Sequence, residues 1–211
     1  EDDGASFSIA TRLRGDRNGL NAVKLALSNG ETIVDTAVIG ANAINDLLTE
    51  IKSKVVQGNQ ASLDAATRTS LNEDITALLD QITTTVGSAE FDNINLIKTD
   101  ASTLSILSSV KGSVIQVSAQ ILDVTALGVN AISVLTSASA ATALTNINTA
   151  ITLGTDRAAA LSSSARGVEI QSDFTSSLIN VFDEGIGKIV NSDLAEESAK
   201  LQALQIQQQL A

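Results

Sequence analysis

Four side chains with oxygen donors lie close together in one polar stretch of the sequence, at Asp92, Asn93, Asn95 and Asp100. Carboxylate and amide oxygens are the ligands that Ca²⁺ prefers in proteins. A calcium-binding loop also requires a regular ligand spacing and a glutamate at its last position. Neither is present in this stretch. We therefore interpret it as a polar turn rather than a metal site.

Three further motifs can each be interpreted as a site or, more simply, as part of an ordinary helix. Gly185-Ile186-Gly187-Lys188 has part of the pattern of a phosphate loop, but the preceding strand and the full spacing are absent. Glu196 and Glu197 are adjacent, so on a helix they point apart and cannot act together as an acid and a base. Arg14-Gly15-Asp16 is the integrin-binding tripeptide, but it falls inside a predicted helix rather than on a loop. We favour an ordinary helix in all three cases, with Ile186 of the second motif on the seam.

The composition argues against catalysis and against several classes of partner. The 211 residues include no histidine and no cysteine, which removes the commonest general base and the thiolate metal ligands. The formal net charge of -11 argues against nucleic acid, which requires a basic face. No apolar run approaches the roughly 20 residues that span a bilayer. We expect no enzyme activity, no catalytic or metal-binding residues, no cofactor, and neither nucleic acid nor membrane as a partner.

The element that organises the chain is a long helix predicted over residues 1–57. Apolar residues recur in it in alternating steps of three and four, which places them on one side of the helix as a seam. No proline interrupts the pattern. Gly30 falls on the seam, and we expect another helix to approach closely there. The seam consists of Leu13, Leu20, Val23, Leu27, Val34, Ile44, Leu48, Ile51 and Val55.

Two more helices are predicted, a shorter one over residues 62–87 and a second long one over residues 138–211. A short connection after the first helix should make the shorter helix pack antiparallel to it. The second long helix repeats the seam spacing of the first and supplies the long partner that the first requires. Its seam consists of Ile147, Ile151, Leu161, Val168, Ile179, Phe182 and Ile186.

A β or irregular region is predicted between these helices, over residues 91–135. Branched residues are enriched around Gly112, which favours a small hairpin with strands over residues 106–110 and 114–121 and Gly112 in the turn. Residues 123–135 are consistent with either a loop or a short strand.

Together the elements predict a mainly α fold in a single domain of residues 1–211. The two long helices would pack as a long antiparallel, coiled-coil-like rod with the hairpin region beside it. Aromatic residues make up only 2% of the chain, which suits a thin rod of aliphatic side chains better than a globular core. The chain begins without methionine and ends on a sequence typical of a helix interior, so we expect both ends to be cut.

Four stretches carry a resemblance to one family. An acidic lead into Ile9-Ala10-Thr11-Arg12-Leu13 comes first, and Ala43-Ile44-Asn45-Asp46-Leu47-Leu48 follows on the same helix. Glu90-Phe91-Asp92-Asn93 is similar to a Glu-Phe-Asn-Gly turn. Val190-Asn191-Ser192-Asp193-Leu194-Ala195-Glu196-Glu197 resembles an Asp-Ala-Asp-x-Ala-Glu-Glu pattern that follows a long C-terminal helix. In this order the four stretches resemble the bacterial flagellins.

This resemblance implies the conserved rod core (D1) of a flagellin, with the terminal helices truncated. It implies a secreted, extracellular structural protein that self-assembles into the bacterial flagellar filament for motility. By the same resemblance, export proceeds without a cleaved signal peptide, and an export chaperone and a cap protein are partners.

Charged residues near the two ends are candidates for contact with neighbouring subunits. On the flagellin interpretation, the arginines of the first helix form a charged face that is either solvated or meets a neighbour. The candidates are Arg12, Arg14, Arg17, Asp193 and Glu196.

One departure from the family pattern falls at Glu50. Aligned through Ile51 and Val55-Val56-Gln57, the arginine on which the family's innate immune receptor site is centred corresponds to Glu50 in this sequence. The charge is reversed, which argues against recognition by that receptor.

Two alternatives stand beside the filament subunit. A hook–filament junction protein shares the terminal helices, but the match on the outer part of the first helix favours flagellin. A flagellin-like cell-surface protein could instead bind an extracellular ligand such as a polysaccharide. Carbohydrate sites usually offer aromatic platforms, and the chain has four phenylalanines with no tryptophan or tyrosine.

Overall fold

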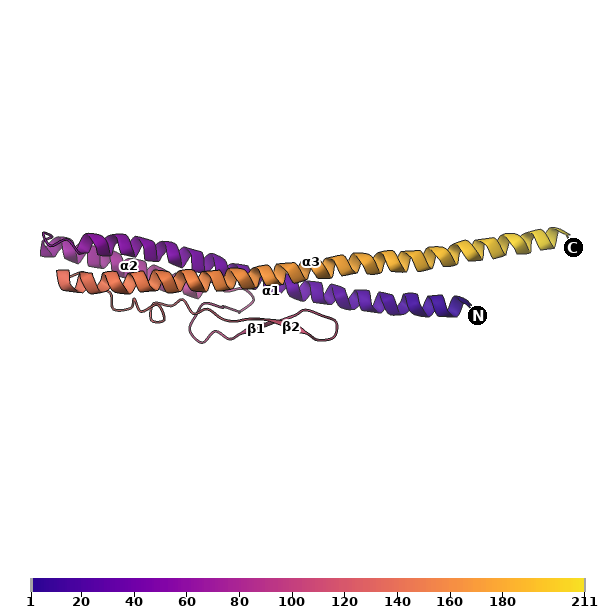
Figure 1. The fold of residues 1–211 in the computed structure, drawn as a ribbon, viewed down its shortest axis with the longest axis horizontal. Helices are drawn as coiled ribbons and strands as arrows, with labels where there is room; N and C mark the ends of the chain where they lie inside the picture. The colour runs from indigo at the N-terminus through magenta and orange to yellow at the C-terminus, as the bar shows by residue number, and fades with distance from the viewer. Residues whose placement is uncertain (1, 211) are drawn as a thin grey trace. The chain divides into compact units, whose positions relative to one another are not determined.

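The computed structural model describes the backbone of residues 2–210 and the side chains of residues 7–190, 198–199 and 201–208. The predicted mainly α fold with a small hairpin is confirmed (Figure 1). In chain order the elements are α1 (Asp2–Gly58), α2 (Ala65–Ser88), β1 (Leu104–Leu107), β2 (Val114–Val117) and α3 (Ser137–Leu210).

The chain divides into two compact units. Both α1 and α3 pass without a break through the two units, so we keep the single domain of residues 1–211 as a proposal. Unit 1 consists of Glu1–Ser28, Leu107–Val114 and Glu169–Ala211, and unit 2 consists of Asn29–Ile106 and Ile115–Val168.

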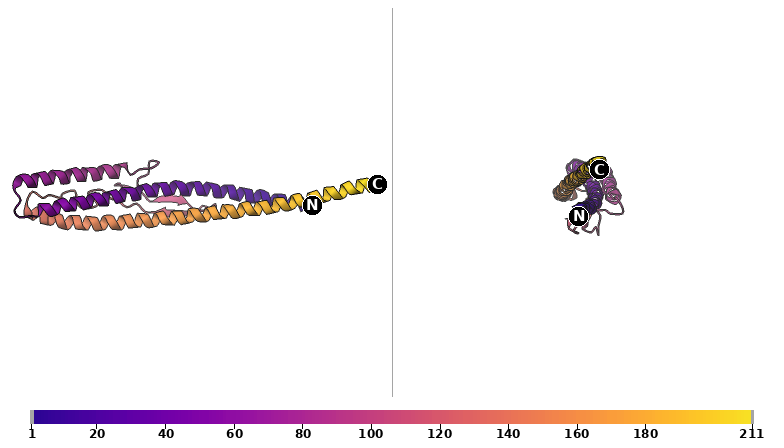
Figure 2. Two further views of the ribbon diagram at one scale, coloured as in Figure 1. Left: turned by 90° about the horizontal axis from the view of Figure 1, so that it is seen from above. Right: turned by 90° about the vertical axis from the view of Figure 1, so that its right-hand side faces the viewer.

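Helix α2 packs antiparallel to the second half of α1 within unit 2 (Figure 2). The Asp64 carboxylate caps its first turn by accepting a hydrogen bond of 2.7 Å from the Thr67 N–H, which satisfies one of the free donors at a helix start. Arg68 in this first turn reaches Gly58 at the end of α1. Ala89, at the other end of α2, lies against Gly40.

Helix α3 begins beside the end of α1 and also runs antiparallel to it within unit 2. Thr136 and Ser139 cap it reciprocally, since each side-chain oxygen accepts a hydrogen bond from the other residue's N–H, at 3.0 and 3.1 Å. Gly154 then packs so closely on Asn45 of α1 that a side chain at position 154 would overlap the Asn45 amide oxygen. The two helices therefore approach closely at a position where α3 has no side chain.

The core of unit 2 consists of aliphatic side chains from all three helices and from the segments between α2 and α3. These side chains interlock without aromatic residues, as the composition suggests. The largest that are fully buried in this unit are Ile44, Leu48, Ile51, Ile75, Ile82, Leu96, Ile97, Leu122, Leu127, Ile147 and Leu161.

The β region is a short two-stranded antiparallel hairpin, β1 with β2. Gly112 is in its turn with φ +87°, a conformation that favours glycine. Strand β1 begins two residues earlier than the predicted 106–110 and ends at Leu107. Strand β2 is shorter than the predicted 114–121, because the chain after it turns to pair with the segment after α2. The N–H groups of Gln120 and Leu122 donate to the carbonyls of Leu96 and Ile97, each at 2.8 Å.

The sequence is consistent with either a loop or a short strand over residues 123–135, and in the structure these residues form turns. The Asp123 carboxylate begins them by accepting hydrogen bonds from the Thr125 and Ala126 N–H groups at 2.8 and 2.7 Å. Gly128 follows with φ +70°. The Arg157 guanidinium of α3 donates to the Ile121 carbonyl and holds this segment on unit 2.

A pH dependence follows from Asp123. Partial burial raises the pKa of its carboxyl, but hydrogen bonds from Thr99, Ala126 and Thr125, with the charge of Arg157, outweigh burial and hold the pKa below its ordinary value. A pKa that is lower in the folded state stabilises the fold above the unfolded value of about 3.9. This stabilisation is lost as the pH falls through the folded pKa.

We therefore expect Asp123→Asn to lower the free energy of unfolding at pH 7. The difference between the two proteins should shrink as the pH falls below about 4, because the wild-type carboxyl is then protonated. Urea denaturation at a series of pH values measures it. A difference that stays constant with pH would show that the Asp123 charge contributes nothing.

The prediction that a helix approaches Gly30 is wrong, because its neighbour is Ile106 of β1. A side chain at position 30 would lie 2.7 and 2.9 Å from the Cγ1 and Cγ2 atoms of Ile106, which is 3% exposed. Strand β1 lies against α1 here, and its buried isoleucine occupies the space that the glycine leaves open.

Gly30→Ala is expected to lower the free energy of unfolding by about 1 kcal/mol. The gain in helix propensity is about 1 kcal/mol, and overpacking against Ile106 costs about 1–3 kcal/mol. Gly15→Ala, in the same helix with open space around it, is the matched control and should gain about 1 kcal/mol. Thermal unfolding of both variants measures the contrast, and equal effects would contradict the close contact.

Candidate subunit-contact surfaces

The oxygen-bearing residues that could have bound calcium form a tight turn. Asp92 and Asn93 have φ of 50° and 61°, between Phe91 and Ile94, which form a β-bridge. Asn95 is turned inward and is 4% exposed. Among the described residues no cluster of three or more acidic, histidine or cysteine side chains could hold a metal.

The other motifs lie in helices. Arg14-Gly15-Asp16 is part of α1, and Gly185-Ile186-Gly187-Lys188 is part of α3. The Lys188 ammonium pairs with Glu184 at 2.6 Å one turn away. The side chains of Glu196 and Glu197 lie outside the described residues. The placements of the first two motifs match their interpretation as parts of helices.

The residues of the two predicted seams differ in burial along the helices. Leu13 at one end of α1 is partly exposed, as are Ile151, Phe182 and Ile186 of α3. The others are buried: Leu20, Val23, Leu27, Val34, Ile44, Leu48, Ile51, Val55, Ile147, Leu161, Val168 and Ile179.

Of the three proposed subunit-contact residues whose side chains the structure describes, Arg17 is engaged within the chain. The Arg17 guanidinium binds Asp183 of α3 through two nitrogens, at 2.6 and 3.2 Å. Arg12 and Arg14 are exposed on α1. The side chains of Asp193 and Glu196 lie outside the described residues.

The hairpin turn is fixed on unit 1 by both long helices. The Gln171 amide of α3 donates to the Ser108 carbonyl at 3.1 Å. On the other side, a side chain at position 19 of α1 would lie 2.9 Å from Cγ1 of Val110. Val110 therefore rests directly on the α1 backbone at Gly19.

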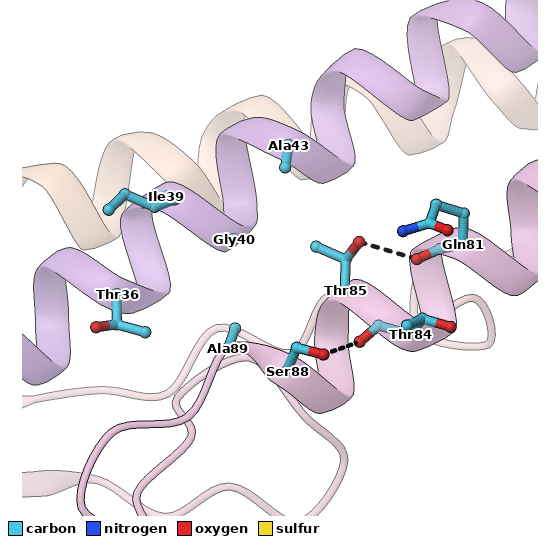
Figure 3. Close-up of a pocket in the computed structure, with 9 residues that line it drawn as sticks. All are labelled: Thr36, Ile39, Gly40, Ala43, Gln81, Thr84, Thr85, Ser88 and Ala89. Atoms are coloured by element: carbon cyan, nitrogen blue, oxygen red, sulfur yellow. Dashed lines mark hydrogen bonds between the residues drawn. The ribbon is translucent and has the colours of Figure 1, made fainter.

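A groove of about 320 Å³ runs between α1 and α2 in unit 2 (Figure 3). Gly40, Ala43 and Ala89 form its apolar part, and Ile39 beside them is 70% exposed. The remaining lining residues are polar and uncharged: Thr36, Gln81, Thr84, Thr85 and Ser88.

The hydroxyl groups of this groove are already used within α1 and α2. The Thr85 hydroxyl donates to the Gln81 carbonyl at 2.9 Å, and the Ser88 hydroxyl donates to the Thr84 carbonyl at 2.8 Å (Figure 3). Since no ionisable side chain lines the groove, it offers shape and apolar contact rather than acid–base chemistry.

A second hollow, which shares Gln81 with the groove, contains the charged residues. It is about 370 Å³ and lined by Glu50, Lys54 and Asp74. The Lys54 ammonium lies 2.6 Å from the Asp74 carboxylate, and the hydrogen bond and charge of Asp74 raise the pKa of Lys54. Glu50 is exposed beside this pair.

Two family models match the two helical parts of the chain. The bacterial flagellin N-terminal helical region matches residues 1–102, and the C-terminal helical region matches residues 144–211. Flagellin FljM of Caulobacter vibrioides is 36% identical over 100% of this chain and 77% of its own length. Flagellin C of Rhizobium meliloti is 30% identical over 99% of this chain and 81% of its length.

The chain belongs to the bacterial flagellin family.

The fold agrees with solved structures that are distant in sequence. A Bacillus cereus flagellin superposes with a TM-score of 0.53 at 18% identity, over 77% of this chain and 86% of that one. A structure described as a flagellar hook-associated protein of Vibrio parahaemolyticus gives 0.69 at 14% identity, over 85% and 95%.

The function of this flagellin is structural: it is a subunit of the bacterial flagellar filament. The filament is an extracellular appendage, and the family is a structural rather than an enzymatic one. None of the described helices is long and apolar enough to cross a membrane. The surfaces described above are therefore candidates for contact between subunits.

Sequence reasoning missed two polar residues that position these surfaces in this flagellin. Arg68 is 6% exposed and Asn95 is 4% exposed, and both bind backbone carbonyls. A signal for Arg68 was present, because Arg68, Leu71 and Ile75 follow one another in steps of three and four, the same spacing as in the seams of the long helices. Nothing in the spacing of Asn95 distinguishes it from the exposed polar residues around it.

Proposed function

We propose that this chain builds the filament by self-association through the outer faces of its helices, without catalysis. The observation that carries the proposal is the burial pattern on the helices that match the family. The apolar seams of α1 and α3 face into the chain, which leaves the other faces for neighbours. Contacts between different faces continue from copy to copy and produce an open helical polymer.

Electron microscopy of cells tests this function. Deleting the gene, together with any other flagellin genes, should remove the filaments, and restoring this gene alone should return them. Immunogold labelling with an antibody to the hairpin turn should then mark the restored filaments along their length. Cells that show the protein at their surface after the gene is restored, but carry no filaments, would contradict the proposal. That result would favour a surface receptor instead.

The route to the filament is a further part of the proposal. We propose that the protein leaves the cell without cleavage of a signal peptide, and that an export chaperone and a cap protein assist it. The family resemblance supports this route. Mass spectrometry of protein from sheared filaments should give the mass encoded by the gene, apart from its initiator methionine. A missing N-terminal segment of signal-peptide length would contradict it.

We also propose that Glu50 weakens recognition by the innate immune receptor of flagellins. A carboxylate here meets a site built for an arginine, and like or unpaired charges at an interface cost binding free energy. Glu50→Arg should raise the response of receptor-expressing reporter cells about tenfold, which corresponds to about 1.4 kcal/mol. Ser53→Arg, an exposed position on the next turn, should leave the response unchanged. Equal responses to both variants would contradict the role of Glu50.

Polysaccharide capture receives no support from a specific observation. Phe7, Phe91 and Phe174 are exposed, but they lie far apart in the sequence, and none of them lines the groove between α1 and α2.

A further inference from the structure

Most of the large apolar side chains that are exposed in the described chain belong to unit 1 rather than unit 2. On α3 they follow a regular spacing. Ile170, Phe174 and Val181 are 62%, 55% and 63% exposed, and exposed Ser177 completes steps of four, three and four. We name these four residues the α3 stripe. This spacing is the one with which a helix receives another helix.

The α3 stripe lies away from the contact that α3 makes inside the chain. Thr175 and Ile179 are buried, and at 3.6 residues per turn the stripe is about 140° around the helix from them. Glu169 and Asp173 follow one edge of the stripe. No ion pair among the described residues engages either carboxylate.

Helix α1 has a second outer face in the same unit, with the opposite charge. Phe7, Thr11, Arg14, Asn18 and Leu25 are exposed on it. Phe7 and Leu25 are 67% and 66% exposed. We name these five residues the α1 outer face.

The charges along the α1 outer face are basic. Arg14 lies on the face and Lys24 at its edge, and neither takes part in an ion pair of the described residues. Arg17 is already bound to Asp183. Unit 1 therefore presents one apolar surface with unpaired basic charge and another with unpaired acidic charge.

We propose that the α3 stripe of one subunit binds the α1 outer face of the next copy of the same chain. Opposite charges select this pairing, because two α3 stripes would bring Glu169 and Asp173 against their own copies. The contact joins two different surfaces, so each subunit keeps one of each surface free and the assembly stays open. This inference rests on the proposed self-association and assigns the surfaces that make it.

Cysteine cross-linking in filaments from cells tests the pairing, since the chain contains no native cysteine. Arg14→Cys and Asp173→Cys place one thiol on each surface. Oxidised filaments of the double variant should give a ladder of covalent oligomers, and filaments of either single variant should stay monomeric on a denaturing gel. Thr83→Cys, exposed on α2, with Asp173→Cys is the matched control and should give no ladder.

Intact filaments of the double variant without a ladder would overturn the pairing and leave the filament function standing. Cross-linking of a single variant with itself would show that a surface meets its own copy, and would also overturn it. A chain that forms no filaments even as wild type would instead refute the proposed function.

Charge exchange covers the case in which the cysteine variants fail to assemble. Arg14→Glu or Asp173→Arg alone should shorten the filaments or remove them, and the two together should restore wild-type length. If the losses of filament length from the two single variants instead add in the double variant, while circular dichroism of the monomers is unchanged, the pairing would be overturned.

Discussion

Replacing Arg68 with alanine is expected to lower the free energy of unfolding by about 3 kcal/mol. Its guanidinium is buried and donates to the carbonyls of Gly58, Gln60 and Val134, at 2.5, 2.6 and 3.2 Å. These carbonyls belong to the end of α1, to the connection with α2 and to the segment that leads into α3. Without the guanidinium, three acceptors lose their donor, and a hydrogen bond to a charged group is worth more than a neutral one.

Thermal unfolding followed by circular dichroism measures the effect. A loss of this size should lower the melting temperature by about 6–12 °C in a chain of this length. Arg166→Ala, at an exposed position on α3, is the matched control and should change stability by less than about 0.5 kcal/mol. Equal losses in both variants would mean that the buried guanidinium does not hold the three segments together.

Arg68→Lys separates geometry from charge. A lysine keeps the positive charge but has no planar fork to reach carbonyls in different directions. We expect it to recover less than half of the stability lost in the alanine variant. Full recovery would show that charge alone is sufficient at this position.

The helices were predictable because their information is local and repeated. Steps of three and four along α1 mark one side of a helix whatever lies beside it, and Ile44, Leu48 and Ile51 are all fully buried. The spacing does not identify which segment packs against that side of the helix. The spacing that includes Gly30 indicates a close approach, but it does not distinguish a helix from Ile106 of a strand.

The polar interior was not predictable in the same way, because its bonds join residues that are distant in sequence. Arg68 meets Val134, and the turn at Asp123 depends on Thr99. The length of β2 depends likewise on where the following chain pairs with the segment after α2. Neither the amino-acid composition nor the spacing of the apolar residues indicates which distant residues will be in contact.

The surfaces differ from the core in what the sequence reveals. The arginines of α1 were recognisable as a charged face, but only the structure separates Arg17, which is bound to Asp183, from Arg14, which is exposed without such a partner. The α3 stripe has the same spacing as the seam, so the sequence does not show which side of α3 is covered. The burial of individual residues distinguishes the covered side of α3 from the α3 stripe. The charges beside the stripe then indicate which surface it can bind.

Asn95→Ala is expected to lower the free energy of unfolding by about 3 kcal/mol, the second large effect. The Asn95 amide donates to the Val86 carbonyl at 2.6 Å. Its oxygen accepts from the N–H groups of Ile97 and Lys98 at 2.9 and 3.0 Å. One side chain thus satisfies the end of α2 and orients the chain that follows, so alanine leaves three buried or half-buried backbone groups unpaired.

Urea denaturation measures this loss, with Asn148→Ala on the exposed surface of α3 as the control that should change by less than about 0.5 kcal/mol. Asn95→Asp is the sharper variant, because at pH 7 it keeps both acceptor bonds but places a carboxylate oxygen, in place of the donor, against the Val86 carbonyl. Its loss should equal or exceed that of the alanine variant, because a charged carboxylate is buried there against a carbonyl oxygen. An aspartate variant as stable as wild type would show that the bond to Val86 contributes nothing. A loss equal to that of alanine would show that the donor is the group on which the turn depends.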